Sequence, residues 1–217
     1  MNYCKKIEPT SAITHFVGFG LSIAALVLMV VYASIYGTAS HIVGASIFGS
    51  SLILLYAFST MYHCVPKQSS KKNLFLKLDY TMVFVLIAGT YTPITLAMPQ
   101  RGWGWSLFGV VWGLAALGII LKHSGYLMKS KIPTLIYLAM GWMIVIAIFP
   151  IAQWLSKSAI MWLFIGGLCY SIGCIFHYLD GKKTIHHWFT HHDIFHLFVI
   201  AGSFAHFWLV LKFVIHT

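Results

Sequence analysis

The sequence predicts an all-α, polytopic membrane protein, folded as a bundle of seven transmembrane helices. Of its 217 residues, 59% are hydrophobic and only 8% are charged, whereas soluble domains carry roughly a quarter charged residues. Apolar stretches recur along the chain, and each reaches the length of about 20 residues that crosses a bilayer. The connections are short, so we expect one domain over residues 1–217, in a multi-pass protein of the plasma (inner) membrane.

The charges of the connecting segments predict the orientation of the bundle. The expected spans are 12–36, 41–64, 79–98, 104–122, 132–150, 158–179 and 191–214. Of the 14 Lys and Arg residues, only Arg101, Lys157 and Lys212 fall on the side opposite to the N-terminus. The positive-inside rule therefore predicts a cytoplasmic N-terminus and a C-terminus outside. Because the lysines are scattered between apolar runs, the net charge of +10 does not indicate a nucleic-acid surface.

The first three spans carry polar residues near their ends. Before the first span, Thr10 or Ser11 is the expected N-cap. In the second, Ser59 and His63 are four residues apart, so their side chains should point the same way. Asp79 is expected at the start of the third span, and Pro93 should kink or end that helix.

The last four spans contain fewer polar features. Gly109 and Gly113 in the fourth form a small-residue face that favours close helix packing. Cys169 and Cys174 are interpreted as packing residues, and no disulfide framework is expected. The seventh span opens on Thr190–His196, in which two histidines stand four residues apart with a carboxylate between them. Four further histidines are interpreted as polar groups at the membrane edge: His41, His123, His177 and His216.

The predicted topology places several ionisable residues at one membrane depth. His63, Asp79, His192 and His196 all fall near the cytoplasmic ends of their spans. Because His192 and His196 are four residues apart on a helix, the two imidazoles could hold one metal ion. Three histidines and an open position are typical of a catalytic zinc, Zn2+, which lowers the pKa of a bound water to about 7. Asp79 could accept that water's proton, and Ser59 could hydrogen-bond to it or to Asp79.

Other residues near these histidines allow alternative interpretations. His187 and His191 have the same spacing, but His192 and His196 lead directly into an apolar run. Asp193 lies about 100° from His192 on an ideal helix, so we interpret it as a charge at the helix start. The same angle makes Cys64, next to His63, a poor ligand. His206 lies about 21 Å deeper than His192, so we expect it to bond to a neighbouring helix instead.

The motifs resemble those of a known membrane-protein family. They are Glu8, Thr14-His15-Phe-Val-Gly18, Ser59-xxx-His63, Asp79, Ala88-Gly-Thr-Tyr-Thr-Pro93, His192-Asp-Ile-Phe-His196 and His206-Phe207. In this order they are similar to the bacterial hemolysin III branch of the progestin and adipoQ receptor (PAQR) superfamily. The Asn often found between the Glu and the Thr-His is missing, because Ser11 and Ala12 stand in that area, which leaves the role of Glu8 open.

The resemblance implies a metal set and a class of function. It implies a seven-helix bundle with zinc held by His63, His192 and His196, and with Asp79 and Ser59 around the zinc-bound water. Because eukaryotic relatives are regarded as lipid amide hydrolases, we expect a zinc-dependent hydrolase of an acyl-lipid amide or ester in membrane lipid homeostasis. One alternative is a regulator or sensor of membrane state that zinc only stabilises. A pore-forming cytolysin (hemolysin) is another; the lipid substrate and the oligomeric state stay open.

Overall fold

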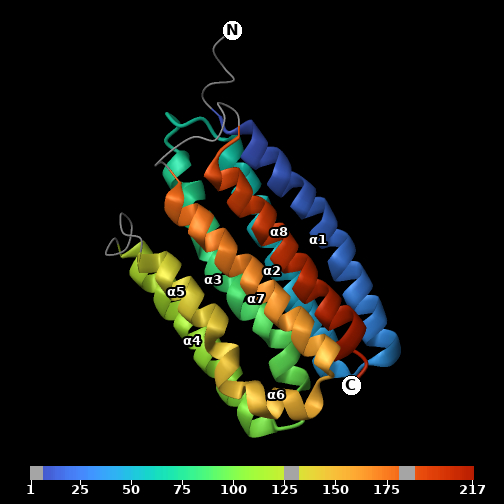
Figure 1. The fold of residues 1–217 in the computed structure, drawn as a ribbon. Helices are drawn as coiled ribbons and strands as arrows, with labels where there is room; N and C mark the ends of the chain where they lie inside the picture. Colours follow the sequence, from blue (N-terminus) through green and yellow to red (C-terminus); the bar gives the residue numbers. More distant parts are fainter. Residues whose placement is uncertain (1–6, 125–131, 181–188) are drawn as a thin grey trace.

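The computed structural model describes residues 7–124, 132–180 and 189–217, which form a bundle of long helices (Figure 1). Seven helical segments within these residues are long and apolar enough to cross a membrane. Five are α1 (Pro9–Tyr36), α2 (Ala39–Cys64), α3 (Lys72–Ala97), α4 (Arg101–His123) and α7 (Lys157–Leu179). The prediction of an all-α bundle with seven spans is confirmed.

Two of the spans are composite. The fifth joins α5 (Ile132–Trp142), a 3-10 stretch (Met143–Ala147) and α6 (Ile148–Trp154). The seventh joins α8 (His191–Leu209) to a π-helical turn (Val210–Val214). The start of α1 and the C-terminus lie at opposite ends of the bundle, as an odd number of spans requires (Figure 1).

The third span begins earlier than the apolar pattern predicts. Lys72 and Lys77 made the stretch before Asp79 too polar for a span, yet α3 starts at Lys72. The ammonium of Lys72 donates hydrogen bonds to the carbonyl oxygens of Tyr62 and Val65, at 2.6 and 3.2 Å. These bonds hold the start of α3 against the end of α2. Asp79 therefore lies about two turns inside the helix rather than at its mouth.

Helix ends and proline also differ from expectation. Glu8 is the N-cap of α1 and Pro9 its first residue, so the expected N-cap at Thr10 or Ser11 is wrong. Proline suits this position because its missing N–H is not needed in the first turn. The helix α3 does not end at Pro93 but continues to Ala97. Its Pro93 packs so closely on Gly44 of α2 that a methyl group at Gly44 would collide with it.

Two buried clusters of apolar side chains hold the helices together. One joins α1, α2 and α8 around Phe48 and includes Leu86 of α3; the other joins α3 to α7 around Phe84 and includes Leu209 of α8. The outer face of α1 presents Ile13 and Phe16, which are 64% and 63% exposed, as a lipid-facing surface does. A methyl group at Gly109 or Gly113 would meet no atom within 4 Å, so the expected small-residue packing face contacts no described neighbour.

Candidate metal centre

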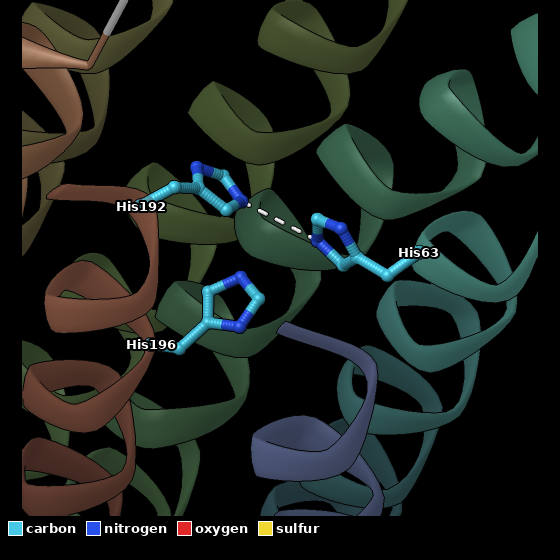
Figure 2. A group of neighbouring side chains, drawn as sticks. All are labelled: His63, His192 and His196. Carbon is cyan, nitrogen blue, oxygen red and sulfur yellow. Dashed lines mark hydrogen bonds between the residues drawn. The ribbon is translucent and has the colours of Figure 1, made fainter. Parts of the chain in front are cut away.

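Three histidines converge at the end of the bundle where α1 begins. His63 lies in the last turn of α2, while His192 and His196 lie one turn apart at the start of α8. One ring nitrogen from each lies within 4.8 Å of those of the other two. His63 and His196 are 1% exposed, and the three rings turn toward one another in Figure 2. This group could hold a metal ion.

The start of α8 is fixed by a capping box that Asp193 completes. The backbone N–H and the hydroxyl of Thr190 both donate to Asp193 Oδ2, at 2.7 and 2.9 Å. In return, the Asp193 N–H donates to Thr190 Oγ1. Asp193 thus acts at the helix start, as the sequence predicted. Its other oxygen accepts a 2.6 Å bond from Ser11 of α1, a contact the sequence did not reveal.

Each of the three imidazoles has an oxygen of the protein next to its Nδ1. His63 Nδ1 lies 2.7 Å from Glu8 Oε2, and His196 Nδ1 lies 3.2 Å from Thr14 Oγ1. His192 Nδ1 lies 3.4 Å from Asp180 Oδ2, at ion-pair range. The Thr14 hydroxyl donates to the Ser11 carbonyl, so its oxygen accepts the Nδ1 proton of His196. For His63 and His196, these partners favour a proton on Nδ1 and leave the Nε2 lone pair free for a metal.

The geometry between His63 and His192 fits a shared ion. Their Nε2 atoms are 3.3 Å apart (Figure 2). If both Nδ1 atoms carry protons, both Nε2 atoms carry lone pairs, and no hydrogen bond can join them. Two imidazoles on one tetrahedral zinc, with bonds of about 2.0–2.1 Å, bring their nitrogens to about 3.3–3.4 Å. The residues therefore fit the expected metal.

Glu8 anchors His63 twice, and this explains a residue whose role the sequence left open. Besides its side-chain bond, the Glu8 N–H donates to the His63 carbonyl at 3.2 Å. Lys67 Nζ lies 3.0 Å from Glu8 Oε1, and Lys72 Nζ lies 3.9 Å from Oε2. The hydrogen bonds from His63 and Lys67 hold the pKa of Glu8 far below its usual range, although partial burial acts in the opposite direction. Glu8 is therefore a carboxylate at neutral pH.

Asp79 and Ser59 lie beside the three histidines and outside the group itself. Ser59 is 1% exposed, one turn before His63 on α2, and hydrogen-bonds to Asp79 of α3. Both residues line the same cavity as His192 and His196. The structure thus brings all five predicted site residues together, while their chemical roles remain predictions.

His15 of α1 completes the site, and the sequence assigned it no role. Its ring stacks on His196 with centroids 3.4 Å apart and meets Tyr56 edge-on at 5.1 Å. Neither ring nitrogen has a hydrogen-bond partner among the described residues. No sequence spacing could place His15 here, because 181 positions of numbering separate it from His196 and only helix packing joins them.

A cavity of about 230 Å³ extends from the histidines into the bundle between α3, α5, α7 and α8. At the metal end it is lined by His15, Ser59, Asp79, His192 and His196. At the far end it is lined by Thr90, Tyr91, Trp142, Gly167 and His206. Between the ends its wall is mainly apolar, with Val83, Leu86, Ile87 and Val199. From Asp79 to Thr90 the cavity follows α3 for about 16 Å.

The remaining histidines have varied environments. His191 stacks near Phe176 rather than joining the group, and His187, its possible partner, lies outside the described residues. His177 was expected to be an edge residue, yet it lines the cavity with its ring 5.8 Å from that of His192. His41 caps α2 through Thr38, and His123 bonds to Thr81. Cys64 is exposed and is not a member of the group.

His206 differs partly from expectation. Its Nδ1 bonds within its own helix, to the Gly202 carbonyl at 2.9 Å, rather than to a neighbouring helix. Its ring does contact a neighbour, because it stacks on Tyr170 of α7 with centroids 5.4 Å apart.

Comparison with known proteins identifies relatives over nearly the whole chain. A family model described as "Haemolysin-III related" matches residues 4–207. The chain is 41% identical over 212 residues to "Hemolysin-3" of Bacillus cereus, covering 98% of this chain and 94% of the relative. It is also 41% identical to "Hemolysin-3 homolog" of Bacillus subtilis (strain 168), covering 95% and 93%. A human protein, "Monocyte to macrophage differentiation factor", is 26% identical over 78% of this chain and 69% of its own length.

Proposed function

The chain belongs to the haemolysin-III-related family of integral, multi-pass membrane proteins, and from this premise we propose that it is a zinc-dependent hydrolase of an acyl-lipid amide or ester. In this proposal His63, His192 and His196 hold the zinc. Asp79 and Ser59 act on the water that attacks the lipid carbonyl. The product would be a free acyl chain, and the biological role would lie in membrane lipid homeostasis.

One observation carries the proposal: the Nε2 atoms of His63 and His192 lie 3.3 Å apart beside an apolar cavity. A structural zinc site closes its four positions with protein ligands, whereas a catalytic site keeps one open. The described residues supply three nitrogens here, and the cavity lies beside them. This arrangement supports a site that meets a substrate.

The chemistry would divide between the ion and the chain's own residues. When bound, zinc supplies Lewis-acid polarisation of a carbonyl and water of lowered pKa. Asp79 would take a proton from the attacking water as the water oxygen bonds to the acyl carbon. It would then give this proton to the leaving nitrogen or oxygen as the C–N or C–O bond breaks. The hydrogen bond with Ser59 would orient the Asp79 carboxyl group for both steps.

The shape of the cavity supports an acyl chain as the substrate's apolar part. Its apolar wall continues inward from the histidines for about 16 Å along α3. An extended hydrocarbon chain would fill such a space with its carbonyl at the metal end and would keep bulk water away. If the N-terminus is cytoplasmic, as the lysine distribution predicts, the reaction would occur at the cytoplasmic side of the bilayer.

A non-catalytic regulator is the second candidate, and contacts of α1 favour it. Ser11 bonds to Asp193 and Thr14 to His196, which joins the start of α1 to the start of α8. Glu8 bonds to His63, which joins the start of α1 to the end of α2. In that case zinc would only join these helix ends, and Asp79 would not be needed for the phenotype.

The experiment compares zinc content and membrane lipids for the wild type, Asp79→Asn and His63→Ala. Under the hydrolase proposal, the wild type and Asp79→Asn contain about one zinc per chain by elemental analysis, and His63→Ala does not. Only the wild type should deplete an acyl lipid in the expressing cells. His123→Ala is the matched control, because His123 is exposed at the same end of the bundle and should keep both properties.

Three results would change the conclusion. Purified wild type without zinc would remove the basis of the proposal. An Asp79→Asn variant with the lipid profile and phenotype of the wild type would favour the regulator. Leakage of liposomes at low protein density would instead support the cytolytic activity to which the bacterial relatives' names refer.

A further inference from the structure

The far end of the cavity contains a buried histidine that the proposed reaction does not use. His206 is 6% exposed and lies ten residues beyond His196 on α8. Its ring borders both the main cavity and a smaller pocket beyond it. Ionisable side chains are unfavourable in the interior of a membrane bundle, and those found there commonly contact a substrate or ion.

The packing around His206 holds its ring in one orientation. The ring stacks on Tyr170 of α7. It also fills the space beside Gly166, where a methyl group would overlap it. The neighbouring helix thus provides both a flat aromatic surface and a residue without a side chain. The ring cannot turn freely, so its two nitrogens have separate surroundings.

Those surroundings leave one hydrogen-bond position unfilled. Because the Gly202 carbonyl can only accept, the 2.9 Å contact from Nδ1 shows that Nδ1 carries the proton. In a neutral ring, Nε2 is then an acceptor, and it has no partner among the described residues. An acceptor that borders an apolar cavity can take a hydrogen bond from a ligand bound there. The position therefore suits a ligand that brings a hydrogen-bond donor.

The other polar side chains at this end already have partners within the bundle. Each bonds to a backbone carbonyl or to another side chain; they are Thr90, Tyr91, Trp142, Tyr170 and Ser171. The donors of Thr90, Tyr91, Trp142 and Ser171 are thus used within the bundle, and His206 adds an imidazole acceptor to this end of the cavity. An apolar cavity with a few polar groups is typical of a site that selects a particular polar group on a largely apolar ligand.

We propose that His206 forms a hydroxyl-binding subsite, which selects acyl chains that carry a hydroxyl group far from the carbonyl. The inference rests on the proposed function, since it places the carbonyl at His63, His192 and His196. Ten helical residues separate His196 from His206 by about 15 Å. An extended chain advances roughly 1.2 Å per bond, from about 3.6 Å per three-bond residue, so the hydroxyl falls about 12 bonds from the carbonyl carbon. The hydroxyl donates to Nε2.

The test measures the binding of hydroxylated and unsubstituted octadecanoic acids to zinc-loaded protein in detergent. Each acid displaces a fluorescent fatty acid, and the series contains octadecanoic acid and its 2-, 12- and 17-hydroxy derivatives. In the wild type, the 12-hydroxy acid should bind about tenfold more tightly than the others, the effect of one buried hydrogen bond. His206→Phe keeps a flat ring without the acceptor, so it should lower only the affinity for the 12-hydroxy acid, to that of octadecanoic acid.

The controls separate this inference from the proposed function. His123→Phe changes an exposed histidine outside the cavity and should retain the preference. Equal binding of all four acids to the wild type would overturn the hydroxyl subsite and leave the hydrolase proposal standing. Failure of every acid to bind would overturn the acyl cavity, and both proposals with it. The wild-type series decides the matter even if His206→Phe does not fold.

Discussion

Removing the charge of Glu8 should weaken metal binding at His63 without removing a ligand. Glu8 Oε2 lies 2.7 Å from Nδ1 of a histidine that is 1% exposed, so the bond is charge-assisted and shielded on the histidine side. Glu8→Gln keeps an acceptor oxygen of the same shape but loses the charge. A charge-assisted hydrogen bond contributes about 1 kcal/mol more than a neutral one, which predicts roughly fivefold weaker zinc binding.

Glu8→Ala extends the same reasoning. It leaves His63 Nδ1 without an acceptor, so zinc binding should weaken by roughly 100-fold. This is the upper end of the range for removing the hydrogen-bond partner of a metal-binding histidine. The assay is competition for zinc against a chromophoric chelator in detergent at constant pH. Lys67→Gln is the control, because Lys67 is 60% exposed and its ion pair with Glu8 should change the affinity by less than about threefold.

The graded order of these variants is the decisive result. If Glu8→Ala binds zinc as tightly as the wild type, His63 is not oriented through Nδ1 and the assignment of Nε2 as the metal ligand is wrong. If Lys67→Gln weakens binding as much as Glu8→Ala, the effect comes from the general charge near the site rather than from the contact with His63.

Three other substitutions test separate parts of the structure. His192→Ala should lower zinc affinity by at least about 100-fold, whereas His191→Ala should leave it within about twofold, in the same chelator assay. Gly118→Ala should lower the free energy of unfolding by about 1–3 kcal/mol in a denaturant titration, because the added methyl group overlaps the Phe84 ring. Gly113→Ala is the control: the space around Gly113 is open, so the free energy of unfolding should change by less than about 0.5 kcal/mol. Ser11→Ala removes a 2.6 Å bond to the buried Asp193 and should lower stability by about 1–3 kcal/mol in the same titration; an unchanged value would mean that this bond does not hold α1 to α8.

The bundle and much of its site were accessible from sequence because both depend on local patterns. Hydropathy gave the spans, and the four-residue spacings gave Ser59 with His63 and His192 with His196. The start of α3 was misjudged, since a count of charges cannot show that Lys72 bonds to the end of α2. Because its ammonium bonds to backbone carbonyls, Lys72 can stand at the start of a helix that its polarity alone would exclude.

The partners of the histidines could not be predicted in the same way. Glu8 and His63 are 55 residues apart, and Thr14 and His196 are 182 apart. No spacing rule covers such distances, because these contacts depend on how α1 lies between α2 and α8. For His15 and His206, only the packed rings of their neighbours show how each imidazole is placed.

The contact between the first and last helices also has a consequence for biosynthesis. Ser11 and Asp193, and likewise Thr14 and His196, meet across 182 residues of chain. At about 5–20 residues per second, a ribosome needs roughly 10 to 40 s to make the intervening segment. Until then, Ser11 and Thr14 lack these partners, and neither His192 nor His196 has yet been made. If these histidines hold zinc as proposed, the ion can be loaded only onto a chain whose insertion is nearly finished.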